Sequence, residues 1–281
     1  MPEFVTYVGK LPYGPATVEY LGDLLRRHWE QTGARCGRRV LGWWDQVVMW
    51  LRSMHDNTRV VDLARDNGIG RSTAYRLLDE TTEVVAAAAP ALASALLAAK
   101  IAGHEHVLVD GTVVRTDRIG EPGPTKGVDL WWSGKHRAHG GNIQVIAAPD
   151  GHPIWCSEVR PGREHDITCA RAIGLPEALD EMWNCEADTC CPVRRSTLAD
   201  LGYEAEAAFT TPTKKPRAQS LTADQRWNNR LVACLRAPDE RANALLKNFK
   251  ALRRVTRHPS KITALARAAL VLVHHLTDRQ V

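Results

Sequence analysis

The segment His106-Val-Leu-Val-Asp110-Gly111 decides the fold of the larger part of this chain. It is a short apolar run that ends in a carboxylate and a glycine, which is typical of a buried strand. A second run of this kind, Ser196-Thr-Leu-Ala-Asp200, also ends in an aspartate. If the two strands are neighbours in one sheet, Asp110 and Asp200 emerge at the same edge. Two carboxylates that close repel each other unless a cation lies between them.

A pair of aspartates at a sheet edge suits Mg²⁺, which prefers oxygen ligands and keeps waters that a phosphate can displace. A third acid from a packed helix completes positions for two metal ions. Two ions about 4 Å apart can activate a water or a 3′-hydroxyl and stabilise the leaving oxygen. We therefore expect two Mg²⁺ or Mn²⁺ ions, hydrolysis of a phosphodiester and strand transfer.

Glu240 is our candidate for the third acid. It lies at the start of an expected helix, with Arg236 one turn before it and Lys247 two turns after it, so that the three share a face. Asp239 is the rival and points nearer to the side of the following apolar residues. A simpler interpretation stays open, because Pro238 followed by two acids is what any helix start prefers.

The remaining pattern predicts a mixed sheet with helices packed on its faces, an α/β (α+β) fold. Residues 142–147 and 154–159 alternate as strands around the turn Pro149-Asp-Gly151, which predicts a hairpin. Residues 207–212 are a possible further strand. Helices are expected over residues 165–179, 222–236, 238–254 and 260–276.

The N-terminal part has the spacing of a helix-turn-helix. After an expected helix over residues 40–54 come helix 58–66, turn 67–70 and helix 71–80, with Thr58 as cap and Gly68 in the left-handed turn position. The second helix of such a motif enters the DNA major groove by its N-terminal end. A plain helical hairpin is the alternative. The residues expected to face DNA are Arg71, Ser72, Tyr75 and Arg76.

The charge balance is mildly basic, with a formal net charge of +5 over 281 residues. The stretch from Arg241 to Arg267 contains eight Lys or Arg and no acid, which suits a phosphate backbone or, more plainly, a solvated helix face. The Ala-rich stretch from Val84 to Ala99 contains Pro90 and predicts a soluble helix rather than a membrane span.

Cysteine usage and the N-terminus favour a cytoplasmic protein. The seven cysteines are an odd number without regular spacing, which fits a reducing compartment. Residues 1–10 lack the apolar core of a secretory signal. Cys185, Cys190 and Cys191 cluster, and we interpret them as free thiols, because zinc needs a second ligand pair.

Five segments in a fixed order resemble bacterial insertion-sequence transposases of the DDE type, in particular actinobacterial members of the Harbinger-like superfamily. They are Val109–Thr112, Ser133–Gly140, Pro161–Asp166, Leu198–Tyr203 and Arg236–Arg241.

The resemblance implies a ribonuclease H-like catalytic domain over residues 101–281 behind a helix-turn-helix region over residues 1–100. It also implies that Asp110, Asp200 and Glu240 are the catalytic, metal-binding triad. The related Tyr-Arg-Glu-Lys pattern is present as Arg236, Glu240 and Lys247. Its Tyr position is Ala233, so a Tyr contact to a DNA end is missing or is made by Trp227.

Further residues are candidates for DNA contact. The alternative is that the basic ones are exposed loop cations without a fixed partner and that the aromatic ones are buried in the core. The loop between Gly134 and Gly140, which contains Lys135, His136, Arg137 and His139, is expected to hold the scissile phosphate. We also expect His165 and Asp166, at the start of a helix, to belong to the site. Trp131 and Trp132 could stack on a flipped base. The basic candidates are Lys135, His136, Arg137, His139, Lys214, Lys215, Arg217, Arg236, Arg241 and Lys247.

These observations together predict a cut-and-paste DNA transposase, an Mg²⁺-dependent endonuclease and polynucleotidyl transferase. Its partners are double-stranded DNA, as terminal inverted repeats and target, and further copies of the chain, because two ends must be brought together. Two rivals stay open: a non-catalytic helix-turn-helix regulator, and a structure-specific nuclease of the same fold.

Overall fold

The computed structural model describes residues 10–34, 39–184, 195–217 and 219–277. The chain divides into two compact units, Met1–Val85 and Ala86–Val281. The boundary expected from the sequence lies at residue 100. The boundary falls earlier because helix α5 (Leu92–Ile101) contributes buried side chains to the core of the second unit. Cys185, Cys190 and Cys191 lie outside the described residues.

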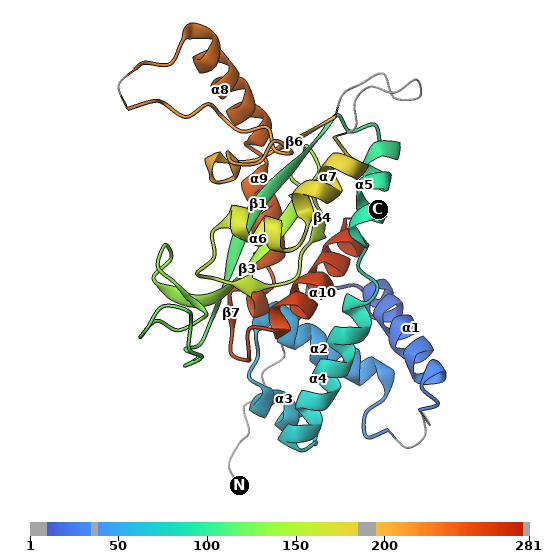
Figure 1. Ribbon diagram of the computed structural model, residues 1–281. Helices are drawn as coiled ribbons and strands as arrows, with labels where there is room; N and C mark the ends of the chain where they lie inside the picture. Colours follow the sequence, from blue (N-terminus) through green and yellow to red (C-terminus); the bar gives the residue numbers. More distant parts are fainter. Residues whose placement is uncertain (1–9, 35–38, 185–194, 218, 278–281) are drawn as a thin grey trace. The chain divides into compact units, whose positions relative to one another are not determined.

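The described part of the first unit is helical (Figure 1). Its helices are α1 (Pro15–Gln31), α2 (Trp43–Asp56), α3 (Val60–Asp66) and α4 (Arg71–Ala86). No helix was predicted over α1, although Val18, Leu21, Leu25 and Trp29 form a buried stripe at helical spacing. A basic side chain stacks on that stripe, since the Arg39 guanidinium lies 4.0 Å from the Trp29 ring centroid.

Helices α3 and α4 form the expected helix-turn-helix. Gly68 in the turn has φ +64°, a conformation that glycine adopts without strain. Leu63 and Ala64 pack with Ala74 and Leu77 as the buried centre. The predicted cap is wrong: α3 begins after Arg59, and the hydroxyl of Thr58 donates instead to the Arg52 carbonyl at 3.3 Å.

A mixed seven-stranded sheet forms the centre of the second unit in the described residues. Its main path runs β2-β3-β1-β6, with β4 and β5 also paired to β3 and β7 paired to β1. β1 pairs antiparallel with β3 and parallel with β6. The strands are β1 (His106–Thr116), β2 (Trp132–Ser133), β3 (Ala138–Ala147), β4 (Pro153–Cys156), β5 (Arg160–Pro161), β6 (Ser196–Leu198) and β7 (Arg254–Val255).

Helices cover both faces of this sheet. On one face, Val107 and Val109 of β1 and Ile146 of β3 join the core formed with α5, α6 (Asp166–Ala172) and α7 (Leu175–Met182). On the other face lie α9 (Asp239–Lys247) and α10 (Lys261–Leu276), which contact β4. Alternation along β1 therefore decides which helices each of its side chains meets.

Several predicted elements differ from the observed ones because a glycine, a proline or strand pairing intervenes. The Ala-rich stretch is not one helix: α4 ends at Ala86 and α5 begins after Pro90. The helix expected over 165–179 is broken at Gly174, whose φ is +66°. Residues 207–212 form no strand, only a bridge from Leu198 to Thr210.

The C-terminal helices begin close to where the sequence predicts them. α8 (Ala223–Arg236) starts with a capping box, in which Thr222 and Gln225 exchange side-chain and backbone hydrogen bonds. In Figure 1 this helix extends away from the sheet of its unit, and of its residues only Val232 is buried. The helix predicted over 238–254 ends early, at Lys247, and is followed by a 3-10 turn, η3 (Lys250–Leu252), and by β7. None of the described helices is long and apolar enough to cross a membrane.

Candidate functional site

The strand register brings Asp110 and Asp200 to equivalent positions. β1 and β6 run parallel with Leu108 opposite Leu198, and each aspartate follows two residues later. Asp110 lies on the same face of β1 as Leu108 and meets α9 there, because Asn243 donates to it, and the charge of Asp200 acts on both Asp110 and Asp239. The sequence suggested that the strand ends at Asp110. It does not, because β1 continues to pair with β3 as far as Arg115.

The turn between β3 and β4 provides the surface on which α9 begins. Gly151 in that turn has φ +80°, and a Cβ at this position would overlap the carbonyl oxygen of Pro238. Arg241 of α9 donates to the Asp150 carbonyl at 3.2 Å. This close contact fixes the first turn of α9 over the sheet, and with it the acids that the turn carries.

One side of α9 contacts the acid-bearing face of β1. The Nδ2 of Asn243 donates to Oδ2 of Asp110 at 2.7 Å, and one turn later the Nζ of Lys247 donates to Oγ1 of Thr112 at 2.6 Å. Burial lowers the pKa of Lys247, while the nearby Asp110 carboxylate acts to raise it. Asn243 and Thr112 were not among the predicted site residues. Asn243 could have been predicted from the sequence, because it follows Glu240 by three positions on a helix and has apolar neighbours.

The two candidates for the third acid have different surroundings. Asp239 is only 5% exposed, and its Oδ2 accepts from Arg236 at 3.0 Å. Glu240 is exposed. The charges of Asp239, Asp200 and Asp166 act on Asp110, while the charge of Glu240 acts on Asp239.

The acidic cluster makes ionisation of Asp110 unfavourable. Burial, followed by the charges of Asp239 and Asp200, raises the pKa of Asp110 to about 7. Burial also raises the pKa of Asp239, although Arg236 opposes this. A divalent cation stabilises the ionised form of carboxyl groups that lie close together in a partly buried position.

Two buried polar atoms at this place have no hydrogen-bond partner. They are the acceptor Oδ1 of Asn243 and the donor Nε of Arg236. An unpaired acceptor fits a cation, and an unpaired guanidinium donor fits an anionic oxygen such as that of a phosphate. The donor set therefore fits a divalent ion with an oxyanion, although no group of three His, Cys, Asp or Glu in the described ranges is already arranged as a metal site.

Asp166 lies on the opposite face of β1, against Gly111. A Cβ on Gly111 would overlap the Asp166 carboxylate, so glycine is required for this approach. Asn142 donates to Oδ1 of Asp166 at 2.6 Å, Gln144 donates to Asn142 at 3.3 Å, and the hydroxyl of Tyr203 donates to Gln144. This chain of hydrogen bonds fixes the orientation of each amide and holds the Asp166 carboxylate against Gly111, where its charge still acts on Asp110.

The predicted phosphate clamp is divided between two places. Lys135 and His136 line a cavity of about 220 Å³ together with His165 and Asp166, and the Lys135 Nζ lies 3.6 Å from Oδ2 of Asp166. Arg137 is exposed, with a positive φ of 50°.

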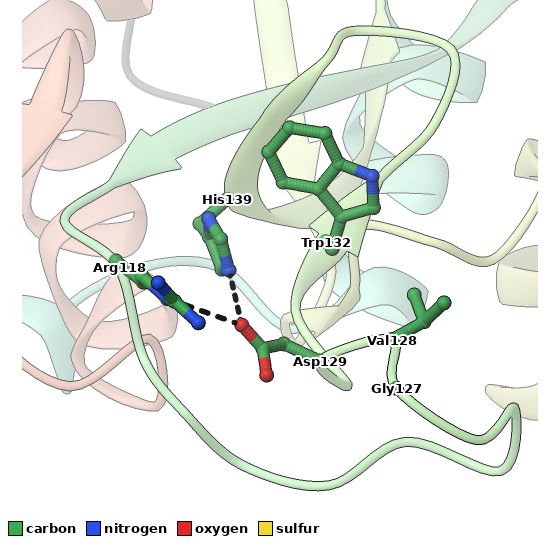
Figure 2. A pocket seen from close by; sticks show the side chains of 6 residues that line it. All are labelled: Arg118, Gly127, Val128, Asp129, Trp132 and His139. Carbon is green, nitrogen blue, oxygen red and sulfur yellow. Dashed lines mark hydrogen bonds and ion pairs between the residues drawn. The ribbon is translucent and has the colours of Figure 1, made fainter.

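His139 belongs to a separate pocket, drawn in Figure 2. Its Nε2 lies 2.9 Å from Oδ2 of Asp129, which Arg118 also approaches to 3.5 Å, and its ring meets Trp132 edge to face at 5.0 Å. Trp131 is buried, and its indole nitrogen donates to Glu121 at 2.6 Å. Of the two tryptophans, Trp132 is therefore the one with an open side.

The other predicted DNA-contacting residues are placed as follows. The four residues at the start of α4, namely Arg71, Ser72, Tyr75 and Arg76, are exposed. In the basic stretch that begins at Arg241, the exposed cations include Arg241, Lys250, Arg253 and Arg254. Trp227 on α8 is 69% exposed. The loop cations Lys214, Lys215 and Arg217 are exposed, and Lys214 pairs with Glu204 at 2.7 Å.

Comparison with known protein families gives one match. The family model described as DDE superfamily endonuclease matches residues 109–274, more than half of the chain. The matched segment includes Asp110 in β1, Asp200 just after β6, and the helix that carries Asp239, Glu240 and Asn243. Comparisons with curated proteins and with solved structures find no match.

Proposed function

Because this chain belongs to the DDE superfamily endonuclease family, we propose that it is a DNA transposase that cuts at transposon ends and joins them to target DNA. The observation that carries the proposal is the convergence of Asp110, Asp200 and the first turn of α9 on one face of the sheet. A mixed sheet covered by helices on both faces is compatible with the ribonuclease H-like fold that we propose for residues 101–281.

Members of this family generally use divalent metal ions. Asp110 and Asp200 would hold such ions, which would supply an activated oxygen nucleophile and charge stabilisation at the phosphate. Arg236 at the end of α8 and Lys247 at the end of α9 would present cationic groups to the substrate phosphates.

We propose Glu240 as the third metal-binding acid. On a helix, positions 240, 243 and 247 form one stripe, and the other two members of that stripe contact β1. Asp239 is already paired with Arg236, whose guanidinium it holds in place. Glu240 makes no hydrogen bond or ion pair with the residues that the structure describes, and its longer side chain can turn toward Asp110 when a cation is present.

Cleavage of DNA that carries the sequences flanking the gene tests this assignment. Asp110→Asn, Asp200→Asn and Glu240→Gln should each abolish Mg²⁺-dependent cleavage while DNA binding is retained. Asp239→Asn should only weaken it, and the exposed Asp224→Asn should leave it unchanged. Loss of cleavage in Asp239→Asn together with full activity in Glu240→Gln would transfer the third position to Asp239.

We propose that the helix-turn-helix of α3 and α4 recognises the terminal inverted repeats through Arg71, Ser72, Tyr75 and Arg76. Lys135, His136, Arg137, His139 and Arg241 are proposed to contact the DNA backbone in the second unit. A regulator without catalytic activity would bind the same DNA but show no Mg²⁺-dependent cleavage. A structure-specific nuclease would cut branched DNA without these ends.

We further propose a bacterial cytoplasmic, nucleoid-associated location and a homodimer or higher assembly on DNA. Two transposon ends must be held together for excision, and one chain provides one acidic cluster. Measuring the mass of the protein–DNA complex with one and with two end sequences tests the assembly. A complex that stays monomeric with both ends present contradicts it.

A further inference from the structure

Asn243 carries an unpaired oxygen at the centre of the acidic site. Its Nδ2 donates to Oδ2 of Asp110 at 2.7 Å, which fixes the orientation of the amide, because a carboxylate oxygen accepts hydrogen bonds. The Oδ1 of the same amide is buried and has no hydrogen-bond partner. Leaving a buried carbonyl oxygen without a hydrogen-bond partner is unfavourable. A group of this kind in a native site needs an explanation.

The surroundings of this oxygen exclude most of the usual partners. Asp110, Asp239 and Asp200 interact electrostatically in this cluster, and ionised carboxylates can only accept hydrogen bonds. The nearby cationic groups make hydrogen bonds to other residues: Lys247 donates to Thr112, and Arg236 donates through Nη2 to Asp239, while its buried Nε makes no hydrogen bond to this oxygen. The Oδ1 of Asn243 is a hydrogen-bond acceptor surrounded by other acceptors, and a metal cation is the partner that would stabilise it there.

The chemistry of the amide oxygen narrows the choice of cation. Neutral carbonyl and amide oxygens, together with carboxylates, are ligands of hard divalent ions such as Mg²⁺ and Ca²⁺, and Mn²⁺ accepts the same donors. An asparagine supplies a ligand without adding negative charge to a site that already holds several carboxylates.

We propose that Oδ1 of Asn243 is a ligand of the divalent cation that binds beside Asp110. The inference rests on the proposed function, since it assigns an additional ligand to the metal site of that function. Asn243 has two tasks in one side chain: its nitrogen orients Asp110, and its oxygen contacts the ion. Asn243, which lies between Glu240 and Lys247 on one side of α9, thus contributes a metal ligand.

Titration of the full-length protein with Mn²⁺, without DNA, tests the proposal, with free Mn²⁺ measured by electron paramagnetic resonance. Asn243→Leu removes the oxygen and should weaken Mn²⁺ binding roughly 10-fold or more, which is the scale at which metal affinity responds to loss of a supporting group. Asn243→Asp keeps an oxygen but removes the donor to Asp110, and should bind Mn²⁺ at least as tightly as the wild type. Asn228→Leu, at an exposed position of α8, is the matched control.

The variants separate a ligand from a residue that only orients Asp110. If both Asn243→Leu and Asn243→Asp lose affinity equally, the amide nitrogen is what matters and the ligand assignment is wrong. Unchanged affinity in Asn243→Leu also overturns it. If Asn243→Leu does not fold, as judged by circular dichroism, the Asp variant decides alone. Absence of Mn²⁺ binding by the wild type, or binding insensitive to Asp110→Asn, contradicts the proposed function itself.

Discussion

Replacing Asp110 by Asn should stabilise the metal-free protein at alkaline pH. The carboxyl group of Asp110 is held mostly out of water beside other carboxylates, and its pKa rises from 3.8 to about 7. The unfolded chain therefore releases this proton at lower pH than the folded chain does. The destabilisation is absent below pH 3.8, grows as the pH rises, and is complete above about pH 7.

The size of the effect follows from the two pKa values. At about 1.4 kcal/mol per pKa unit, ionised Asp110 costs the folded state about 4 kcal/mol at pH 8 and about 2 kcal/mol at pH 5. Asn at this position keeps an oxygen that can accept from Asn243 and carries no charge. The stability advantage of Asp110→Asn should therefore increase by about 2–3 kcal/mol between pH 5 and pH 8.

Hydrogen exchange of β1 and β3 peptides in increasing urea, with EDTA present, measures this stability in the second unit specifically. Adding Mg²⁺ at pH 8 should reduce the difference, because an ion that binds only the folded site stabilises the wild type and not the variant. A variant that is no more stable than the wild type at pH 8 would refute the electrostatic reasoning. A difference that Mg²⁺ leaves unchanged would refute ion binding at Asp110.

The remaining predictions concern the two close glycine contacts and the DNA-binding helix. Gly111→Ala should displace Asp166, lower the stability to urea by about 1–3 kcal/mol and slow cleavage, while Gly134→Ala, with open space around its Cβ, should change neither. Gly151→Ala should cost more than Gly174→Ala in the same assay. Both glycines have positive φ, but only at Gly151 would the new methyl group strike another backbone, that of Pro238; equal costs would contradict the docking of α9 on this turn. Arg71→Ala and Arg76→Ala should each weaken binding of end DNA and reduce its dependence on salt by about one phosphate contact, as measured by fluorescence anisotropy, and the exposed Arg27→Ala on α1 is the control. Equal salt dependence in all three variants would exclude α4 from the interface.

The sequence alone predicted the parts of this protein that depend on local pattern. Alternating and apolar runs identified β1, β3 and β6, and the spacing around Gly68 identified the helix-turn-helix, because burial on one face and turn geometry leave a direct trace in residue order. The same pattern predicted that Asp110 and Asp200 belong to neighbouring strand segments, and β1 and β6 do pair. Pattern was less informative where a single glycine interrupts a helix, as Gly174 does.

Tertiary contacts decided what the helix spacing left open, namely which acid of α9 is buried in the absence of a cation. Asp239 and Glu240 are neighbours in sequence, and a small rotation of their helix exchanges the buried acid for the exposed one. That rotation is fixed by Pro238 against Gly151 and by Asn243 against Asp110, contacts between residues far apart in the chain. Residue order determines which side chains a helix can present, while the direction in which they point depends on the surface against which the helix packs.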